Sequence, residues 1–354
     1  MRFDLFDLIA TLVKIAIVFG VLMNSVVFMT WVERRVSAWI QDRLGPNRVG
    51  PFGLFQPIAD GVKFLLKEDI VPGQAHKVVY VLAPAASVIA ALTAFSVVPF
   101  GPSLTILGRQ VPLVIADVNV GVLLLLAATS MGVYGIVMAG WASNNKFSLM
   151  GGLRSSAQLI SYELAMGIAV IGVLAAAGTL NLGEVVERQG GRWLGVVPAW
   201  NILTQPLGAL IFLVASYAET NRAPFDLPEA ESELVAGYHT EYSSMKFSMF
   251  MIAEYINMAT SAALFVTLFL GGWQAPGLGH LLSGNALAIG QALAFGVKVS
   301  FFLFLFVWVR WTLPRFRYDQ LMNLGWKVLI PLSLVQVFVV GTLVTFGFYD
   351  WVQG

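Results

Sequence analysis

The sequence contains no cysteine, and this absence excludes several kinds of chemistry. A chain without cysteine forms no disulfide, offers no thiolate nucleophile and cannot hold a cysteine-ligated iron–sulfur cluster. Histidine is also scarce, since His76, His239 and His280 lie far apart and outside the apolar stretches. Haem and metal sites need several convergent ligands, so we expect no metal site and no bound cofactor in this chain.

Charge is the second scarcity. Charged residues make up 12% of the 354 residues, whereas soluble domains carry roughly 25%. Hydrophobic residues make up 58%, and the net charge is +1 with no basic face, which gives no support for nucleic-acid binding. We find neither a phosphate-binding loop nor a convincing GxGxxG element. The composition therefore predicts an integral membrane protein in contact with lipid.

Eight apolar stretches are long enough for helices that cross a bilayer. A hydrocarbon core of about 30 Å needs about 20 apolar residues per helix. We expect spans at approximately residues 8–32, 78–98, 115–139, 158–178, 197–217, 247–270, 289–311 and 326–346. The first lacks a small-residue cleavage site, so we interpret it as a retained helix. The predicted fold is an all-α bundle of eight transmembrane helices in one membrane domain, residues 1–354.

Charged residues gather on one side of this predicted bundle. With eight spans, 15 of the 21 Lys and Arg residues lie at the loops after spans 1, 3, 5 and 7. Positive loops face the cytoplasm, so both termini are expected on the opposite side of the membrane. Most of the acids lie at the same cytoplasmic face. A face with this much charge is expected to dock a partner or to carry chemistry.

One cytoplasmic segment, residues 53–67, has the pattern of an amphipathic helix. Its apolar residues recur at helical spacing, and its polar residues line the other side. At about 1.5 Å per residue the helix is about 20 Å long, which is too short to cross the membrane. We expect it to lie in the plane of the cytoplasmic interface.

A second cytoplasmic segment, the loop at residues 218–246, is rich in acids and is expected to be ordered. It contains Glu219, Asp226, Glu229, Glu231, Glu233 and Glu241. Local capping explains some of them, because Asp226 can be the N-cap of a helix. Glu229, three residues later, can then reach back to the backbone of Asp226. Capping does not explain Glu233, which lies one turn beyond Glu229 on the same face, where like charges repel.

Four ionisable residues lie in or at the ends of predicted spans: Glu163, Glu219, Glu254 and Lys298. Each costs roughly 2.5 to 3.5 kcal/mol to insert, so each has a structural or a functional reason to be there. In a structural role, these acids would hold the helices of the bundle together by pairing with buried cations and polar neighbours. Buried carboxylates close together can also share protons, as a proton relay requires.

Four long stretches of the chain resemble one known family. They are "VERRVSAWIQDRLGPNRVGPFGLFQPIADGVKFLLKED", "GGLRSSAQLISYELAMG", "AETNRAPFDLPEAESELVAGYHTEYSSMKFSMFMIAEYIN" and "WVRWTLPRFRYDQLMNLGWKVLIPL". These stretches resemble the H subunit, at the heel of the membrane arm, of the proton-pumping NADH:quinone oxidoreductase, respiratory complex I. The resemblance covers the whole chain, in order and with matching spacing.

The resemblance implies a role in an H⁺-transporting enzyme of the bacterial inner membrane, with both termini on the periplasmic side. In that family this subunit anchors the hydrophilic arm, forms much of the quinone tunnel with two soluble partner subunits, and begins the proton path. Small membrane subunits lie beside it. The chain itself carries no redox centre, and FMN and iron–sulfur clusters are expected in partner subunits.

The resemblance also assigns residues. For the quinone site it implies Glu33, Arg34, Asp60, Phe225, Asp226 and Arg315. For the proton path it implies Asp60, Glu163, Glu219, Glu229, Glu231, Glu233 and Glu254, to which we add the buried Lys298. Some relatives carry a further acid where this chain has "AATSMGVYG", so a polar step there must use Ser130, Tyr134 or water.

Three other interpretations remain. The chain could be the equivalent anchor of a membrane-bound hydrogenase, although the length of the "GPNRVGPFGLFQ" match favours the quinone enzyme. A stand-alone ion-coupled transporter would show two related halves, and we find no convincing repeat. A purely structural scaffold would explain docking but leaves Glu163, Glu254 and Lys298 without a cause.

Overall fold

The computed structural model describes residues 4–193, 197–227 and 231–349, and most of its regular structure is helical. Seven helical runs in these residues are long and apolar enough to cross a membrane. Six of them are α1 (Leu5–Ile40), α3 (Lys77–Phe95), α4 (Gly121–Ala142), α5 (Lys146–Ala177), α10 (Ser244–Phe269) and α11 (Gly284–Thr312). The seventh joins α12 (Tyr318–Asn323), a π-helical turn η4 (Leu324–Leu329) and α13 (Ile330–Thr345). These runs overlap seven of the eight predicted spans.

The predicted span at 197–217 is built differently. It consists of a short helix α7 (Asn201–Thr204) and a 14-residue helix α8 (Pro206–Glu219). Proline has no N–H for the helical ladder, and Gln205 between the two helices has non-helical torsion angles (φ −134, ψ 55). A helix of 14 residues is about 21 Å long, shorter than the hydrocarbon core. The prediction of a single long helix here was wrong, because Pro206 interrupts it.

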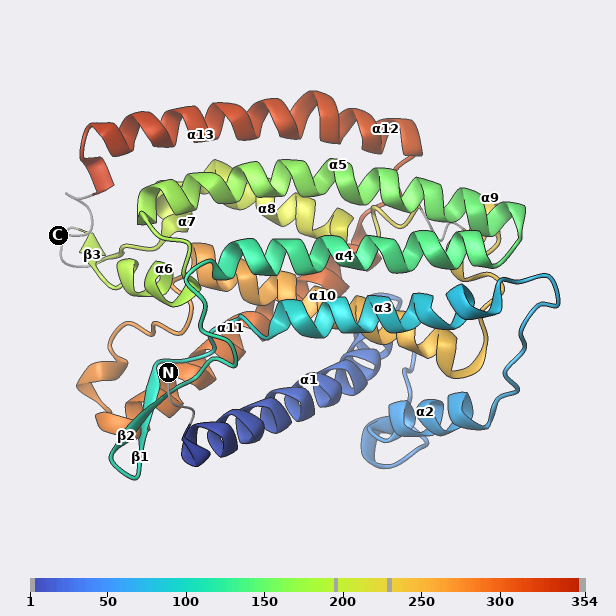
Figure 1. Ribbon diagram of the computed structural model, residues 1–354, viewed down its shortest axis with the longest axis horizontal. Coiled ribbons are helices and arrows are strands. Elements are labelled where there is room, and N and C mark those ends of the chain that lie inside the picture. The colour runs from blue at the N-terminus through green and yellow to red at the C-terminus, as the bar shows by residue number, and fades with distance from the viewer. Residues whose placement is uncertain (1–3, 194–196, 228–230, 350–354) are drawn as a thin grey trace.

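The helices α3, α4 and α5 lie side by side (Figure 1). They approach one another through small residues. A Cβ atom added to Gly135 of α4 would lie 2.1 Å from Ser87 Oγ of α3. One added to Gly140 would lie 2.6 Å from the carbonyl oxygen of Ser148 on α5. Small residues let membrane helices pack at such short range. The same close packing holds α3, α4 and α5 together.

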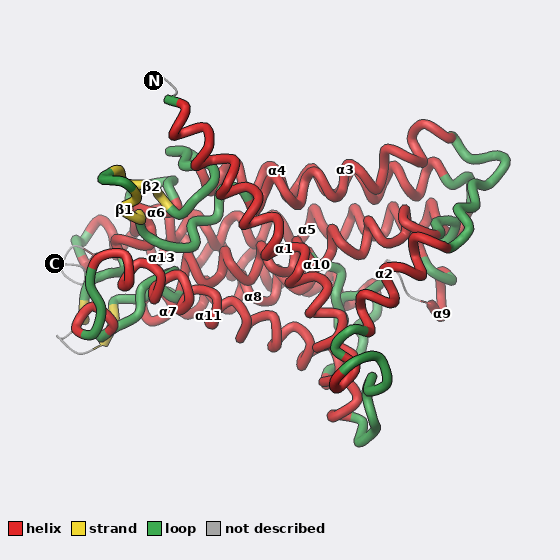
Figure 2. Tube along the Cα trace, turned by 90° about the horizontal axis from the view of Figure 1, so that it is seen from below, coloured by secondary structure: helices red, strands yellow, loops and turns green. Residues whose placement is uncertain are grey.

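The most enclosed of the long helices is α10, and the least enclosed is α1. In the most apolar window of each helix, 67% of the residues are buried in α10 and 11% in α1. Figure 2 shows α1 crossing the other helices obliquely at the edge of the bundle. The single carboxylate of α10, Glu254, is accordingly enclosed, with its side chain 13% exposed, whereas α1 presents most of its surface outward.

The segment predicted as an amphipathic helix contains a 3₁₀ turn η1 (Pro51–Gly53) and α2 (Gln56–Leu66). It lies beside the C-terminal part of α1 (Figures 1 and 2). Trp31 of α1 donates its indole N–H to the carbonyl of Phe52 at 3.2 Å, and Ser244 donates its hydroxyl to the carbonyl of Phe64 at 2.9 Å. These bonds attach the segment to both α1 and α10.

Short elements cap the opposite end of the bundle (Figure 1). Two antiparallel hairpins pair β1 (Ser103–Ile106) with β2 (Arg109–Pro112), and β3 (Arg192–Trp193) with β4 (Val197–Pro198). A short helix α6 (Leu182–Arg188) is capped by Asn181, whose side-chain oxygen accepts the N–H of Gly183 at 2.8 Å. The last short element there is η3 (Leu278–His280).

The acidic loop contains α9 (Glu231–Leu234) and η2 (Gly237–His239). The predicted capping contact of Glu229 lies outside the described residues. The loop packs closely against α5 where Gly237 meets Gly151. The two backbones leave no room for a side chain there, since a Cβ atom on Gly151 would lie 2.7 Å from the Cα atom of Gly237. His239 is buried here, and burial lowers its pKa to about 4. The C-terminal half of the loop is thus fixed by close packing.

Candidate functional site

A buried carboxylate on α1, Glu33, is surrounded by donors from three other parts of the chain. Arg222, just after α8, donates to its two oxygens at 3.0 and 3.1 Å. Tyr255 of α10 donates its hydroxyl to Glu33 Oε2 at 2.5 Å, and Arg310 of α11 donates to Oε1. Glu33 is 7% exposed and Arg222 is 5% exposed, so these charges are neutralised by each other rather than by solvent.

Arg222 also pairs with a second acid. Its Nε atom lies 2.5 Å from Oε1 of Glu254 on α10, and its guanidinium carbon lies 4.5 Å from the centre of the Tyr255 ring. Burial disfavours the charged form of Arg222, but the carboxylates of Glu254 and Glu33 outweigh that effect and raise the pKa of Arg222 well above its ordinary value. Arg222 is therefore a fixed positive charge shared by two acids.

This cluster forms the polar end of a large cavity, which we call the amphiphilic cavity. Its volume is about 570 Å³, and it lies among α1, α2, α10 and α11. Its polar lining includes Glu33, Arg34, Asp60, Arg222, Glu254, Tyr255 and Arg310. Its apolar lining includes Val26, Val27, Phe64, Leu65, Met251 and Ile252. The cavity suits a molecule with a polar head and an apolar tail.

Two of the residues predicted for a quinone site form an ion pair at the wall of this cavity. Arg34 lies 2.5 Å from Asp60, which also accepts a hydrogen bond from Gln56 at 3.3 Å. Arg34 is half exposed, so the pair contributes little to stability. The pair joins α1 to α2, and both of its residues line the cavity.

The remaining predicted quinone residues form a neighbouring set outside the lining of the cavity. Asp226 accepts a hydrogen bond from Arg315 at 2.9 Å, and the Phe225 ring stacks on Phe316 with 5.4 Å between centres. Burial raises the pKa of Asp226, although Arg315 and Arg310 oppose the shift. Because Arg310 also bonds Glu33, this set is electrostatically connected to the cluster.

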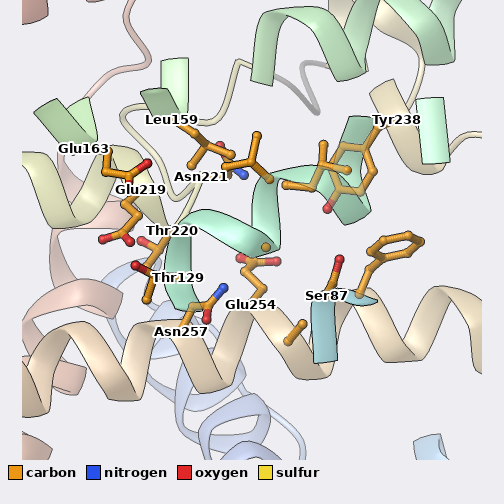
Figure 3. A pocket seen from close by; sticks show the side chains of 15 residues that line it. Ser87, Thr129, Leu159, Glu163, Glu219, Thr220, Asn221, Tyr238, Glu254 and Asn257 are labelled. Carbon is orange, nitrogen blue, oxygen red and sulfur yellow. The ribbon is translucent and has the colours of Figure 1, made fainter. Parts of the chain in front are cut away.

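A second cavity contains three of the predicted proton-path acids, and we call it the carboxylate cavity. It is lined by Glu163 of α5, Glu219 of α8 and Glu254 of α10 (Figure 3). Its volume is about 50 Å³, which is enough for a few waters at about 10 to 15 Å³ each. Among the described residues, its lining includes no lysine and no arginine.

Hydroxyl and amide groups are the partners of these acids. Ser130 of α4 donates its hydroxyl to Glu163, and Thr129 and Ser261 hydrogen-bond to Glu219. Asn257, one turn after Glu254 on α10, also lines the cavity. Hydroxyl and amide groups can exchange hydrogen bonds with water, so this environment permits a change of protonation.

Glu254 lines both cavities. Its carboxylate pairs with Arg222 on the side of the amphiphilic cavity, and Figure 3 shows it among the polar residues of the carboxylate cavity. The sequence suggested Asp60 as a residue common to both sets, but Asp60 lines the amphiphilic cavity alone. The geometry gives the shared position to Glu254.

Other predicted proton-path residues are not brought to these cavities. Glu233 lies at the surface and pairs with Arg154 at 2.6 Å, while Glu229 and the side chain of Glu231 lie outside the described residues. Lys298 donates to the carbonyls of Leu270, Gly272 and Gln274 at 2.7 to 3.0 Å. Leu270 follows Glu254 by more than four helical turns, or about 24 Å along the helix axis. Lys298 thus caps the far end of α10.

Few features of the sequence point to the roles of Arg222, Arg310 and Tyr255. Arg222 was visible as the lone cation near the start of the acidic loop, and Tyr255 directly follows Glu254. Arg310 lies at the end of an apolar stretch and had no such signal. Its contact with Glu33 joins residues 277 positions apart, which only the folded chain reveals.

Comparison with known proteins gives a consistent answer. A family described as NADH dehydrogenase matches residues 13–341. The chain is 51% identical to an H subunit of the NADH-quinone oxidoreductase of Cytophaga hutchinsonii, with 92% of this chain and 94% of the relative covered. It is 52% identical to the H subunit of the NADH-quinone oxidoreductase of Salinibacter ruber, with 94% and 95% covered. It is 50% identical to NADH-quinone oxidoreductase subunit 8 of Rhodothermus marinus, with 93% and 95% covered. The chain is a multi-pass membrane protein that belongs to the family of H subunits of NADH-quinone oxidoreductase.

Proposed function

We propose that this chain is the membrane subunit of an NADH-quinone oxidoreductase that holds quinone in the amphiphilic cavity and starts proton transfer in the carboxylate cavity. The observation that carries the proposal is the position of Glu254, which lines both cavities while paired with Arg222. A carboxylate in this position responds to charge in the amphiphilic cavity and can exchange a proton with water in the carboxylate cavity.

The amphiphilic cavity supports the quinone part of the proposal. A quinone has a polar head that gains negative charge on reduction and a tail that is soluble in lipid. The fixed charge of Arg222, with Arg310 and the Tyr255 hydroxyl nearby, supplies donors for the head. Apolar side chains of α1, α2 and α10 supply a surface for the tail.

The carboxylate cavity supports the proton part. Reduction of quinone places new negative charge beside Arg222. The guanidinium of Arg222 can then pair more strongly with the quinone and less strongly with Glu254. If Arg222 turns toward the reduced quinone, Glu254 loses its counter-ion and takes up a proton. Water between Glu254, Glu219 and Glu163 then provides a route by which protons move inward.

The positions of the first and last long helices support eight membrane crossings, the number that the resemblance implies. The N-terminal end of α1 and the C-terminal end of α13 lie at the same end of the bundle (Figure 1). Both ends of a chain lie on the same side of a membrane only when the number of crossings is even. Seven long runs are present among the described residues, so α7 and α8 together would supply the eighth crossing. In this arrangement α2 and the acidic loop face the cytoplasm, where the hydrophilic partner subunits with FMN and iron–sulfur clusters would dock.

The proposal is tested by Glu254→Gln and Glu163→Gln in the assembled complex. Both variants are expected to lower coupled NADH:quinone reduction by about tenfold or more, because an amide cannot release or accept the transferred proton. Reduction of a hydrophilic artificial acceptor by the peripheral arm should remain normal. Glu184→Gln, at the exposed end of the molecule on α6, is the matched control. Unchanged proton pumping in both test variants would refute the proton path.

A further inference from the structure

The last membrane run contains a π-helical turn, η4, between α12 and α13. A π-helical turn holds an extra residue within the helix, and such turns occur frequently at functional sites. In this chain the turn lies against α5, next to the turn that carries Glu163. Two hydrogen bonds join the α12–η4 segment to α5 at this place.

Both bonds end on the two residues that precede Glu163. The indole N–H of Trp326 in η4 donates to Ser161 Oγ at 3.0 Å. The hydroxyl of Tyr162 donates to the carbonyl of Leu321 in α12 at 2.8 Å, and Tyr162 is fully buried. Successive helix residues are about 100° apart around the axis, so these bonds hold one side of α5 while Glu163 faces Ser130 of α4 on another.

The bond pattern at Ser161 is complete. Its hydroxyl donates to the carbonyl of Ala157 at 2.6 Å, which leaves its oxygen free to accept the indole N–H of Trp326. The turn also packs against Tyr162 at Gly325, where an added Cβ atom would lie 3.4 Å from the ring, an ordinary contact distance. The π-helical turn is therefore fitted closely to this stretch of α5.

The segment just before α12 contacts the quinone-side loop. Arg315 pairs with Asp226 at 2.9 Å, and the backbone N–H of Phe316 donates to the carbonyl of Pro224 at 3.1 Å. The Phe316 ring stacks on Phe225. Residues 315–326 thus touch the Asp226 loop at one end and α5 beside Glu163 at the other. This connection does not pass through Arg222 or Glu254.

We propose that α12 and η4 are a mechanical link that transmits the state of the Asp226–Arg315 pair to Glu163, with Trp326 and Tyr162 as positioning residues. Conversion of the π-helical turn to α-helix would rotate the following residues by about 100° and withdraw the Trp326 indole from Ser161. The turn of α5 before Glu163 would then be held by one bond instead of two. The link rests on the proposed role of Glu163 in proton transfer.

The test is Trp326→Phe in the assembled complex, which removes the N–H donor and keeps an aromatic ring. We expect the number of protons pumped per quinone reduced to fall about threefold, which is within the usual net effect of one hydrogen bond on an equilibrium. Ser161→Ala should reproduce this loss, and Ser161→Thr, which keeps the hydroxyl acceptor, should not. The matched control is Trp308→Phe on α11, since Trp308 is 52% exposed and Trp326 is 51% exposed.

Three results would overturn the link. The first is equal pumping per quinone in Trp326→Phe and Trp308→Phe. The second is full additivity in the Trp326→Phe, Ser161→Ala double variant, because two halves of one bond cannot add. The third is a lower amount of assembled complex with normal pumping in each complex, which is the result of a purely structural role. In all three cases Glu163→Gln still tests the proton path separately, so the link and the proposed function fail independently.

Discussion

The two cavities that meet at Glu254 neutralise their acids in opposite ways. In the amphiphilic cavity, Glu33 is bonded to two arginines and a tyrosine, so its charge has fixed partners. In the carboxylate cavity, Glu163 and Glu219 have hydroxyl partners, and no arginine or lysine of the described chain lines the space. Fixed ion pairs hold a charge in place, whereas acids with hydroxyl and water partners can change their protonation. This difference supports the proposed division, in which one cavity binds the quinone and the other moves protons.

The largest expected effect comes from removing the shared cation. Arg222→Met leaves Glu33 and Glu254 buried with less compensation, which costs about 3 to 5 kcal/mol for a buried pair. A loss of that size lowers quinone reduction by about a hundredfold or more and leaves little assembled complex. Membrane content of the complex and NADH:quinone activity measure both. Arg109→Met removes an exposed pair with Asp4 and should change neither by more than about twofold.

A smaller effect is expected from Tyr255→Phe, which removes a neutral donor from Glu33 and leaves both arginines. A hydrogen bond to a charged group contributes about 2 kcal/mol, so the KM for quinone should rise about tenfold or more. Steady-state kinetics separates KM from kcat. Tyr242→Phe is the control, since this tyrosine lines neither cavity and donates its hydroxyl to the carbonyl of Tyr80 at 3.1 Å. An unchanged KM would mean that this hydroxyl does not order the polar end of the cavity.

Acidification tests the wall of the carboxylate cavity, where Tyr238 lines the space and the next residue, His239, is buried. The folded chain keeps His239 neutral until its pKa of about 4, whereas an unfolded histidine takes up a proton below about pH 6.5. The contribution of His239 to stability is therefore constant above about pH 6.5 and falls as the pH drops toward 4, by up to about 1.4 kcal/mol per pH unit. Thermal inactivation of the complex at about pH 7 and about pH 5.5 measures this loss.

His239→Phe should abolish much of that pH dependence, because phenylalanine has no proton to gain. His280→Phe, at the exposed η3, should leave it intact. Equal acid sensitivity of the His239→Phe variant and the parent chain would show that another group controls it.

The smallest effect is expected from Thr129→Val, which keeps the shape of the side chain and removes one hydroxyl partner of Glu219. Loss of one neutral hydrogen bond is worth about 1 kcal/mol, so coupled activity should fall about fivefold. Thr93→Val, an exposed threonine of α3, serves as the matched control. If both variants behave alike, hydroxyl partners do not set the behaviour of Glu219.

The buried acids could be predicted from the sequence better than their environments could. Glu163, Glu219 and Glu254 were identified because an acid in an apolar stretch is costly, and this cost is readable residue by residue. Their partners come from other helices or from a loop, as Ser130 does for Glu163 and Arg222 for Glu254. Such pairings depend on which face of each helix turns inward, and periodicity alone leaves that face undefined in a helix that is apolar all round.

The same limit explains two places where the structure departs from expectation. Hydropathy averages over the break at Gln205 and Pro206, so it predicts one continuous helix at 197–217 where the chain forms two shorter ones. Residue type places Lys298 with the acids, whereas in the folded chain its ammonium group donates to three carbonyls at the C-terminal end of α10. Depth along the helix axis, rather than residue type, separates Lys298 from the carboxylate cavity.

Local composition was enough to establish that this chain spans a membrane, where most of its helices lie, and which residues are costly to insert. These properties can be read from the sequence because lipid selects for apolar stretches of fixed length. The folded chain was needed to show that the acids fall into two cavities, that Arg222 is shared by Glu33 and Glu254, and that a π-helical turn contacts α5 beside Glu163. Those features arise from contacts between side chains of different helices and loops, which only their packing in three dimensions can specify.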